Sequence, residues 1–285
     1  MKYTLTLIFA CSIFLKLKAQ EIPEIPRLKF FTTSIGATWQ TRYDDIITPL
    51  THSGIGAELH TGAERISEKW YKKFDLWGGY NALESRVDKG YNTTAHGIRY
   101  GISQIWAKRV FKNAPKLHTY FGGQLFHESS MAIHFGNVNN IFSYNAPTGI
   151  AAAAYIKRDV RFFKRQWIVS SQLTLPLLAY NARPSYIGFV SEDNLLKDFG
   201  IVTLNKLVNI DWRWQLDLPL PNSNRLRLSY RWSFLNDTHS GHLQMGAQGL
   251  LVESLFNMPY RIKTDKTGKK SLWNRIFKRK TVTKS

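Results

Sequence analysis

Residues 208–234 read VNIDWRWQLDLPLPNSNRLRLSYRWSF, two segments in which large apolar and polar side chains alternate around a short turn. In the first segment Trp212 and Trp214 alternate with Asp211 and Arg213. A period of two places successive side chains on opposite faces of an extended strand. Proline and asparagine at 219–224 are typical of a turn between two strands. The stretch therefore predicts an antiparallel hairpin with one apolar and one charged face.

The same alternation recurs along the chain. It defines ten segments of strand length: 31–42, 53–64, 70–83, 93–107, 117–128, 148–157, 166–178, 207–218, 225–234 and 243–256. These lengths are close to the ~9–11 residues that a tilted strand needs to cross a bilayer. We therefore expect an all-β fold, a closed antiparallel up-and-down transmembrane β-barrel of about 10 strands, with 12 as the alternative.

Two sets of connections indicate the sides of this barrel. The odd-numbered connections, two of them long, are 43–52, 84–92, 129–147, 179–206 and 235–242, and the shorter even-numbered ones are 65–69, 108–116, 158–165 and 219–224. Long loops on one side and short turns on the periplasmic side are typical of outer-membrane barrels. We therefore expect the odd-numbered loops to be external.

The N-terminal residues resemble an export signal. Residues 1–19 combine the charged Lys2, an apolar stretch at 5–15 and a small residue, Ala19, at a cleavage site. A lipoprotein signal that acylates Cys11, the one cysteine of the chain, is the alternative. We expect residues 20–29 to form a periplasmic tether, 30–256 the barrel and 257–285 a basic periplasmic tail.

Taken together, these features resemble small bacterial outer-membrane β-barrel proteins as a class. The resemblance implies a location in the bacterial outer membrane and contact with its lipids. Fold alone implies no activity, so the leading functional expectation is a non-enzymatic interaction or scaffold component of the cell envelope. Its long external loops would then supply the recognition surface.

The charged face should be enclosed. We expect a barrel-interior charge network of Asp211, Arg213, Asp217, Arg225, Arg227 and Arg231. One register across the turn sets Asp217 opposite Arg225 and Asp211 opposite Arg231. Since small barrels are filled by their own side chains, a narrow channel is a further alternative, and a wide pore is not expected.

The formal net charge of +19 is concentrated partly in the tail. Leu272, Trp273, Ile276 and Phe277 repeat with helical spacing among basic residues, which is typical of an interfacial amphipathic helix. We expect Arg275, Lys278, Arg279 and Lys280 to bind inner-leaflet lipid or a periplasmic protein partner. No nucleic-acid partner is expected, because basic and aromatic residues do not gather on one surface. No cofactor and no metal site are expected.

One motif carries possible chemistry. His127 and Ser129 lie i and i+2 apart, on the predicted lipid-facing side of the segment 117–128 at its external end. A histidine beside a serine can act as its general base. The pair resembles the His-x-Ser arrangement of the outer-membrane phospholipase A and lipid A 3-O-deacylase families, although Ser130-Met131 follows where those families have asparagine and a small residue. A lipid acyl hydrolase is therefore the alternative function, with the third member left open among Asn137, Asn139, Asn140 and Asn145.

A second constellation lies in the loops next to the first and last segments. An outer-membrane aspartate/histidine protease would need paired acids and a His–Asp couple there. The candidates are Asp44, Asp45, His52, Asp237, His239 and His242. The sequence gives a still weaker indication of metal binding by His239 and His242, because two imidazoles without a further ligand seldom form a site.

Overall fold

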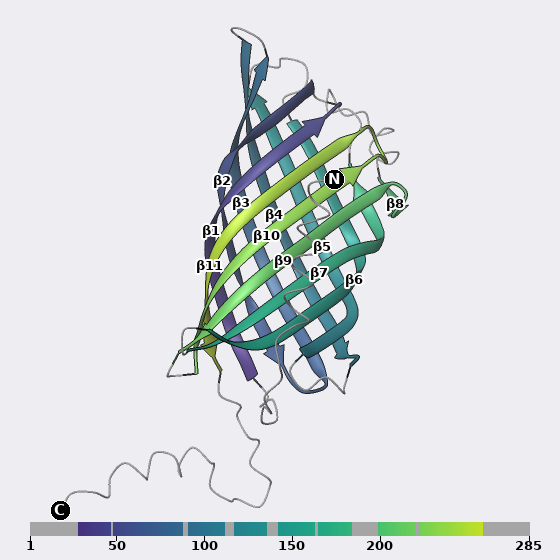
Figure 1. Cartoon of the computed structure of the whole chain (residues 1–285). Coiled ribbons are helices and arrows are strands. Elements are labelled where there is room, and N and C mark those ends of the chain that lie inside the picture. The colour runs from purple at the N-terminus through teal and green to yellow at the C-terminus, as the bar shows by residue number, and fades with distance from the viewer. Residues whose placement is uncertain are drawn as a thin grey trace, which may run out of the picture.

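The computed structural model describes residues 28–46, 48–87, 91–111, 117–135, 142–162, 165–183, 199–220 and 223–258 (Figure 1). These form eleven strands: β1 (Leu28–Asp44), β2 (Thr48–Ile66), β3 (Trp70–Val87), β4 (Tyr91–Arg109), β5 (Leu117–Phe135), β6 (Phe142–Phe162), β7 (Arg165–Ala182), β8 (Phe199–Thr203), β9 (Leu207–Pro219), β10 (Arg225–Asp237) and β11 (Leu243–Asn257). No helix among the described residues is long and apolar enough to cross a membrane.

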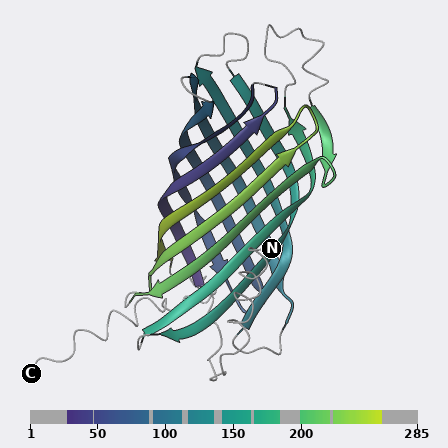
Figure 2. The ribbon, with the colours of Figure 1, turned by 45° about the horizontal axis from the view of Figure 1, so that its top comes forward.

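Ten of these strands close into a ring. Each strand pairs antiparallel with its neighbour in the chain, β7 pairs with β9, and β1 closes the ring on β11 over Phe30–Asp44 and Leu243–Asn257. The ten predicted segments each correspond to one strand of the ring, so the closed antiparallel barrel is confirmed and the twelve-stranded alternative is excluded. The strands share a steep tilt around the barrel, which is visible in both views (Figures 1 and 2).

Strand β8 lies outside the ring and was not predicted. It pairs with β7 over Leu178–Ala182, beyond the part of β7 that pairs with β9. The sequence places it within the 179–206 connection. Its five residues are too few to show a clear period of two, which is why alternation did not reveal it.

The two faces of the wall have opposite chemistry. Ile35, Ile55 and Leu59 point outward and are 62%, 67% and 60% exposed, whereas Arg42 and Arg227 point inward and are buried. A soluble sandwich shows the reverse arrangement, with aliphatic groups in its centre. Apolar side chains facing out around a closed ring suit a hydrocarbon surround, where a closed barrel leaves no unpaired strand edge.

Side chains fill the interior in layers. We call the end where β2–β3, β4–β5, β6–β7 and β9–β10 are joined the turn end, and the opposite end the loop end. At the turn end Tyr71 stacks on Tyr155 with ring centroids 3.9 Å apart, beside Tyr120 and Ile105. Layers of paired charges follow, and near the loop end Leu207, Leu235, Leu243 and Met245 form an apolar cluster.

The predicted register across the β9–β10 turn is wrong by two residues. Asp217 lies opposite Arg227, and Arg225 lies opposite Pro219. The turn is tighter than expected, because the Leu220 N–H donates to the Asn224 carbonyl at 2.9 Å and Ser223 adopts a φ of 65°. A shift of two leaves every side chain on its predicted face.

Candidate active site

The structure places His127 and Ser129 on the outer face of β5, as the alternation predicts. The residue between them, Glu128, and the next serine, Ser130, both point into the barrel, where Arg99 and Arg42 donate to them. Because side chains of a strand alternate between faces, the histidine and the first serine share the side that carries Leu125 and Phe121, both exposed.

The two side chains belong to a hydrogen-bonded chain of three. The Ser129 hydroxyl lies 3.1 Å from His127 Nε2, and His127 Nδ1 lies 2.7 Å from the Thr148 hydroxyl of β6. With the proton on Nδ1, the ring donates to Thr148 and accepts from Ser129. This tautomer leaves Nε2 free to take the serine proton, which is the arrangement of a nucleophile, a base and an orienting group.

Sequence reasoning missed Thr148 as the third member. Asn145 lies opposite Ser130, buried in the lumen, and Asn137, Asn139 and Asn140 lie outside the described residues. The sequence did contain one indication of Thr148. It is a hydroxyl residue at the start of the segment predicted to pair with 117–128. Only the register, in which His127 lies directly opposite Thr148, brings the two side chains together.

A proline interrupts the wall beside this chain. The β5–β6 register reaches His127 opposite Thr148 and resumes with Ser130 opposite Asn145. Pro147 lies in the interval and has no N–H to give to the ladder, and prolines within sheets mark such irregular positions. The interruption falls at Glu128 and Ser129, so the backbone of these two residues is paired mainly through β4, where Ser129 lies opposite Tyr100.

The site is covered in the free protein. Ser129 is 0% exposed, whereas Tyr100 beside it is 41% exposed, with its ring centroid 6.2 Å from that of His127. Directly opposite residues on one face of a sheet have Cβ atoms only about 4.5–5.5 Å apart. Tyr100 is therefore placed beside the serine on the outer face of the wall.

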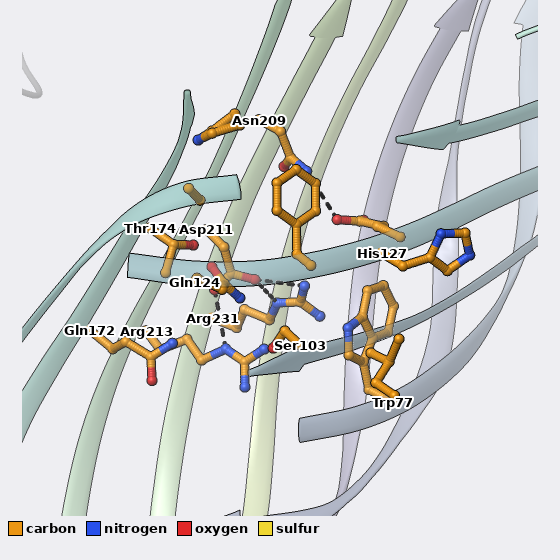
Figure 3. A pocket seen from close by; sticks show the side chains of 15 residues that line it. Trp77, Ser103, Gln124, His127, Gln172, Thr174, Asn209, Asp211, Arg213 and Arg231 are labelled. Carbon is orange, nitrogen blue, oxygen red and sulfur yellow. Dashed lines mark hydrogen bonds and ion pairs between the residues drawn. The ribbon is translucent and has the colours of Figure 1, made fainter. Parts of the chain in front are cut away.

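Behind the site, on the luminal side, lies a polar cavity of about 40 Å³. Figure 3 shows it between Trp77, Asn209, Asp211 and Arg231, with the His127 ring turned away from the Asp211–Arg231 pair. Asn209 donates to Glu128 at 3.0 Å across this space, and Arg99 donates to the other Glu128 oxygen at 2.9 Å.

The structure brings the predicted interior charges together in two groups. Arg227 contacts Asp217 at 2.6 Å and Glu64 at 2.7 Å, and Arg225 lies 3.4 Å from Asp217. In the second group Asp211 lies 2.6 Å from Arg231 and 3.1 Å from Arg213. Both predicted pairs, Asp217–Arg225 and Asp211–Arg231, thus form as diagonal contacts rather than directly opposite ones.

Four acids outside the predicted network complete these groups. Glu64 and Glu253 meet Arg227, and Asp75 lies 2.7 Å from Arg213 while Glu58 lies 3.0 Å from Arg231. All four lie on the inward faces of strands that the alternation located. Their partners lie on distant strands, so the pairing depended on barrel closure. Buried charges of this kind need partners, because an isolated charge away from water costs several kcal/mol.

The other proposed sites are not assembled among the described residues. Arg42 and Arg183 hold Asp44 at 3.1 and 3.0 Å, and His242 Nε2 contacts Asn236 rather than an acid. No group of three or more potential metal ligands occurs in the part of the chain that the structure describes. Arg275, Lys278, Arg279 and Lys280 of the expected binding tail lie outside the described residues.

Comparisons with known proteins identify no family. No family matches the sequence, and no curated protein matches it. Solved structures that the chain is similar to include the attachment invasion locus protein Ail of Yersinia pestis, at 11% identity over 81% of this chain and 100% of the other, with a TM-score of 0.29. The chain is also similar to the translocator domain of the autotransporter NalP from Neisseria meningitidis, at 9% identity over 90% of this chain and 94% of the other, with a TM-score of 0.34.

A third similar structure is an outer-membrane channel from Pseudomonas putida F1, at 5% identity over 85% of this chain and 100% of the other, with a TM-score of 0.33. The class of the protein follows from its own geometry, a closed antiparallel ring with an aliphatic exterior and enclosed charges. It is a ten-stranded bacterial outer-membrane β-barrel.

Proposed function

We propose that this barrel is an outer-membrane lipid acyl hydrolase in which Ser129 is the nucleophile, His127 the general base and Thr148 the residue that orients the imidazole. The observation that carries the proposal is the continuous hydrogen-bonded chain from Ser129 through His127 to Thr148 on the aliphatic outer face. A substrate at that surface must itself be a membrane lipid. The loop end is the expected external side, so the substrate class is an ester of an outer-leaflet lipid.

The reaction divides into two steps. The Ser129 hydroxyl oxygen attacks the acyl carbonyl carbon while its proton moves to His127 Nε2. The bond between the acyl carbon and the alcohol oxygen then breaks, and that oxygen takes the proton from His127. A water molecule attacks the acyl-serine with His127 again as base. The serine ester bond breaks, Ser129 regains a proton, and a fatty acid is released.

Thr148 orients this base. Its hydroxyl accepts from Nδ1 and fixes the ring and its tautomer, as the third member of a catalytic triad does. A neutral hydroxyl adds no negative charge next to the imidazole. The expected activity is therefore lower than that of a triad completed by a carboxylate.

The test uses the purified full-length chain in mixed phospholipid–detergent micelles, with fatty-acid release as the assay and covalent labelling by a fluorophosphonate as the second readout. Ser129→Ala should abolish both. His127→Ala should lower the rate by about 10²–10⁴, the usual contribution of a general base. Ser130→Ala is the matched control, because that serine lies next in the strand but faces the lumen.

The proposal fails if Ser129→Ala leaves fatty-acid release unchanged, or if the wild-type chain neither releases fatty acid nor takes up the label. In that event the expectation of a non-enzymatic interaction or scaffold barrel is the one that stands. Its recognition surface would then be the external loops.

A further inference from the structure

We propose that Glu128 is a positioning residue for the Ser129–His127 pair, acting from the opposite side of the barrel wall. This inference rests on the proposed hydrolase function. Glu128 is the residue between the two reacting side chains and points into the lumen, where its side chain is 13% exposed. Each of its carboxylate oxygens accepts a bond from a different strand.

The first contact ties β5 to its neighbour. Arg99 of β4 donates to Glu128 Oε1 at 2.9 Å, and the same guanidinium lies 3.8 Å from Glu58. Its carbon lies 5.2 Å from the centre of the Trp77 ring, which also faces Arg231 at 4.5 Å. Arg99 is therefore held by Glu58 and Trp77 as well, and a charge-assisted bond from a fixed donor holds its acceptor firmly.

The second contact ties β5 across the lumen. Asn209 of β9 donates to Glu128 Oε2 at 3.0 Å. In the ring, β9 is separated from β5 by β6 and β7. Glu128 therefore holds β5 against a distant part of the wall, which a ladder between adjacent strands cannot do.

These contacts matter because the wall is interrupted at this position. The β5–β6 register omits Glu128 and Ser129, beside Pro147. Neighbouring pairings, His127 with Thr148 and Ser130 with Asn145, bracket the interruption. The luminal bonds of Glu128 are placed to substitute for that interrupted pairing. They fix the backbone on which the 3.1 Å contact between Ser129 and His127 depends.

The test compares Glu128→Gln with Glu64→Gln in the full-length chain. Glu64 is the matched control, because it is another buried luminal acid that receives bonds from an arginine, Arg227, and it lies on β2 away from the site. Both variants lose one luminal carboxylate. Asn209→Ala gives an independent removal of one of the two Glu128 contacts.

We expect Glu128→Gln to lower kcat for ester hydrolysis roughly tenfold with KM changed less than twofold, and fluorophosphonate labelling to slow in parallel. Asn209→Ala should show a smaller effect of the same kind. Glu64→Gln should leave kcat and labelling within twofold of the wild type. Hydrogen exchange measured by mass spectrometry should rise in the segment 125–131 for Glu128→Gln and stay unchanged there for Glu64→Gln.

Two results overturn the inference. The first is Ser129-dependent hydrolysis at the wild-type kcat in Glu128→Gln. The second is unchanged exchange of 125–131 in that variant, a readout that needs no activity. Hydrolysis that persists in Ser129→Ala instead contradicts the proposed function, so the two failures are distinguishable.

Discussion

Arg227 of β10 and Glu64 of β2 meet as a two-pronged ion pair across the lumen, with Nη1 to Oε2 at 2.7 Å and Nη2 to Oε1 at 3.1 Å. Both side chains are fully buried. Since β1 and β11 lie between their strands in the ring, this contact exists only when the first and last strands have paired. The pair therefore reports on closure of the barrel.

Arg227→Met should destabilise the barrel strongly. The change leaves Glu64 and Asp217 buried without their main partner, and breaking a buried pair on one side costs about 3–5 kcal/mol. Urea unfolding in detergent micelles, followed by tryptophan fluorescence, measures this. The double variant Arg227→Met/Glu64→Leu should lose less than the two single changes added together. If the double variant loses as much free energy of unfolding as the two single variants added together, the two side chains are not coupled.

Thr148→Val should lower the hydrolysis rate about fivefold, because it removes one orienting hydrogen bond worth roughly 1 kcal/mol. The substitution keeps the shape of the side chain and its place on the outer face. Thr148→Ser retains a hydroxyl and is the control, with activity expected near the wild type. The measurement is kcat on micellar phospholipid. A Thr148→Val variant as active as the wild type would remove Thr148 from the site.

Tyr100→Ala should speed covalent labelling of Ser129 by a fluorophosphonate. The serine is fully buried and lies directly opposite this exposed tyrosine, so removal of the ring opens a path to the hydroxyl. Tyr230→Ala is a suitable control, since Tyr230 is also exposed on the outer face but lies on β10. Slower or unchanged labelling of Tyr100→Ala would mean that another group covers the serine.

Gly122→Ala should weaken folding, whereas Gly246→Ala should not. A Cβ on Gly122 would lie 2.0 Å from the Trp106 carbonyl oxygen, and a Cβ on Gly246 would meet nothing within 4 Å. Forcing extra volume into a packed position costs about 1–3 kcal/mol, and open surface positions stay within about 0.5 kcal/mol. Samples of each variant are heated to a series of temperatures and run on a gel. The temperature at which the band of the folded barrel disappears measures the stability of each variant. Equal temperatures for the two variants would contradict the close approach at Gly122.

Much of this fold was predictable because the strands of a transmembrane barrel show a pattern that can be recognised from neighbouring residues alone. The alternation of Trp212 and Trp214 with Arg213 depends only on neighbouring residues, so it located each strand of the ring and both faces. The partners of Arg227 could not be found in this way. Glu64 is a remote residue in the sequence, and its contact depends on closure and shear.

The candidate site shows the same division. His127 and Ser129 are two residues apart, so a strand period alone placed them on one face. Thr148 joins them through the register of β5 against β6, and that register passes an interruption at Pro147. The predicted β9–β10 register was wrong for a related reason. The geometry of the turn around Ser223 decides which residues of the two strands lie opposite each other, and a shift of two residues leaves the alternation of faces unchanged.

The reversed distribution of side chains also constrains biogenesis. A chain that folded completely in water would present its ring of aliphatic groups to solvent, and such a surface aggregates. Folding and insertion must therefore proceed as one event at the bilayer.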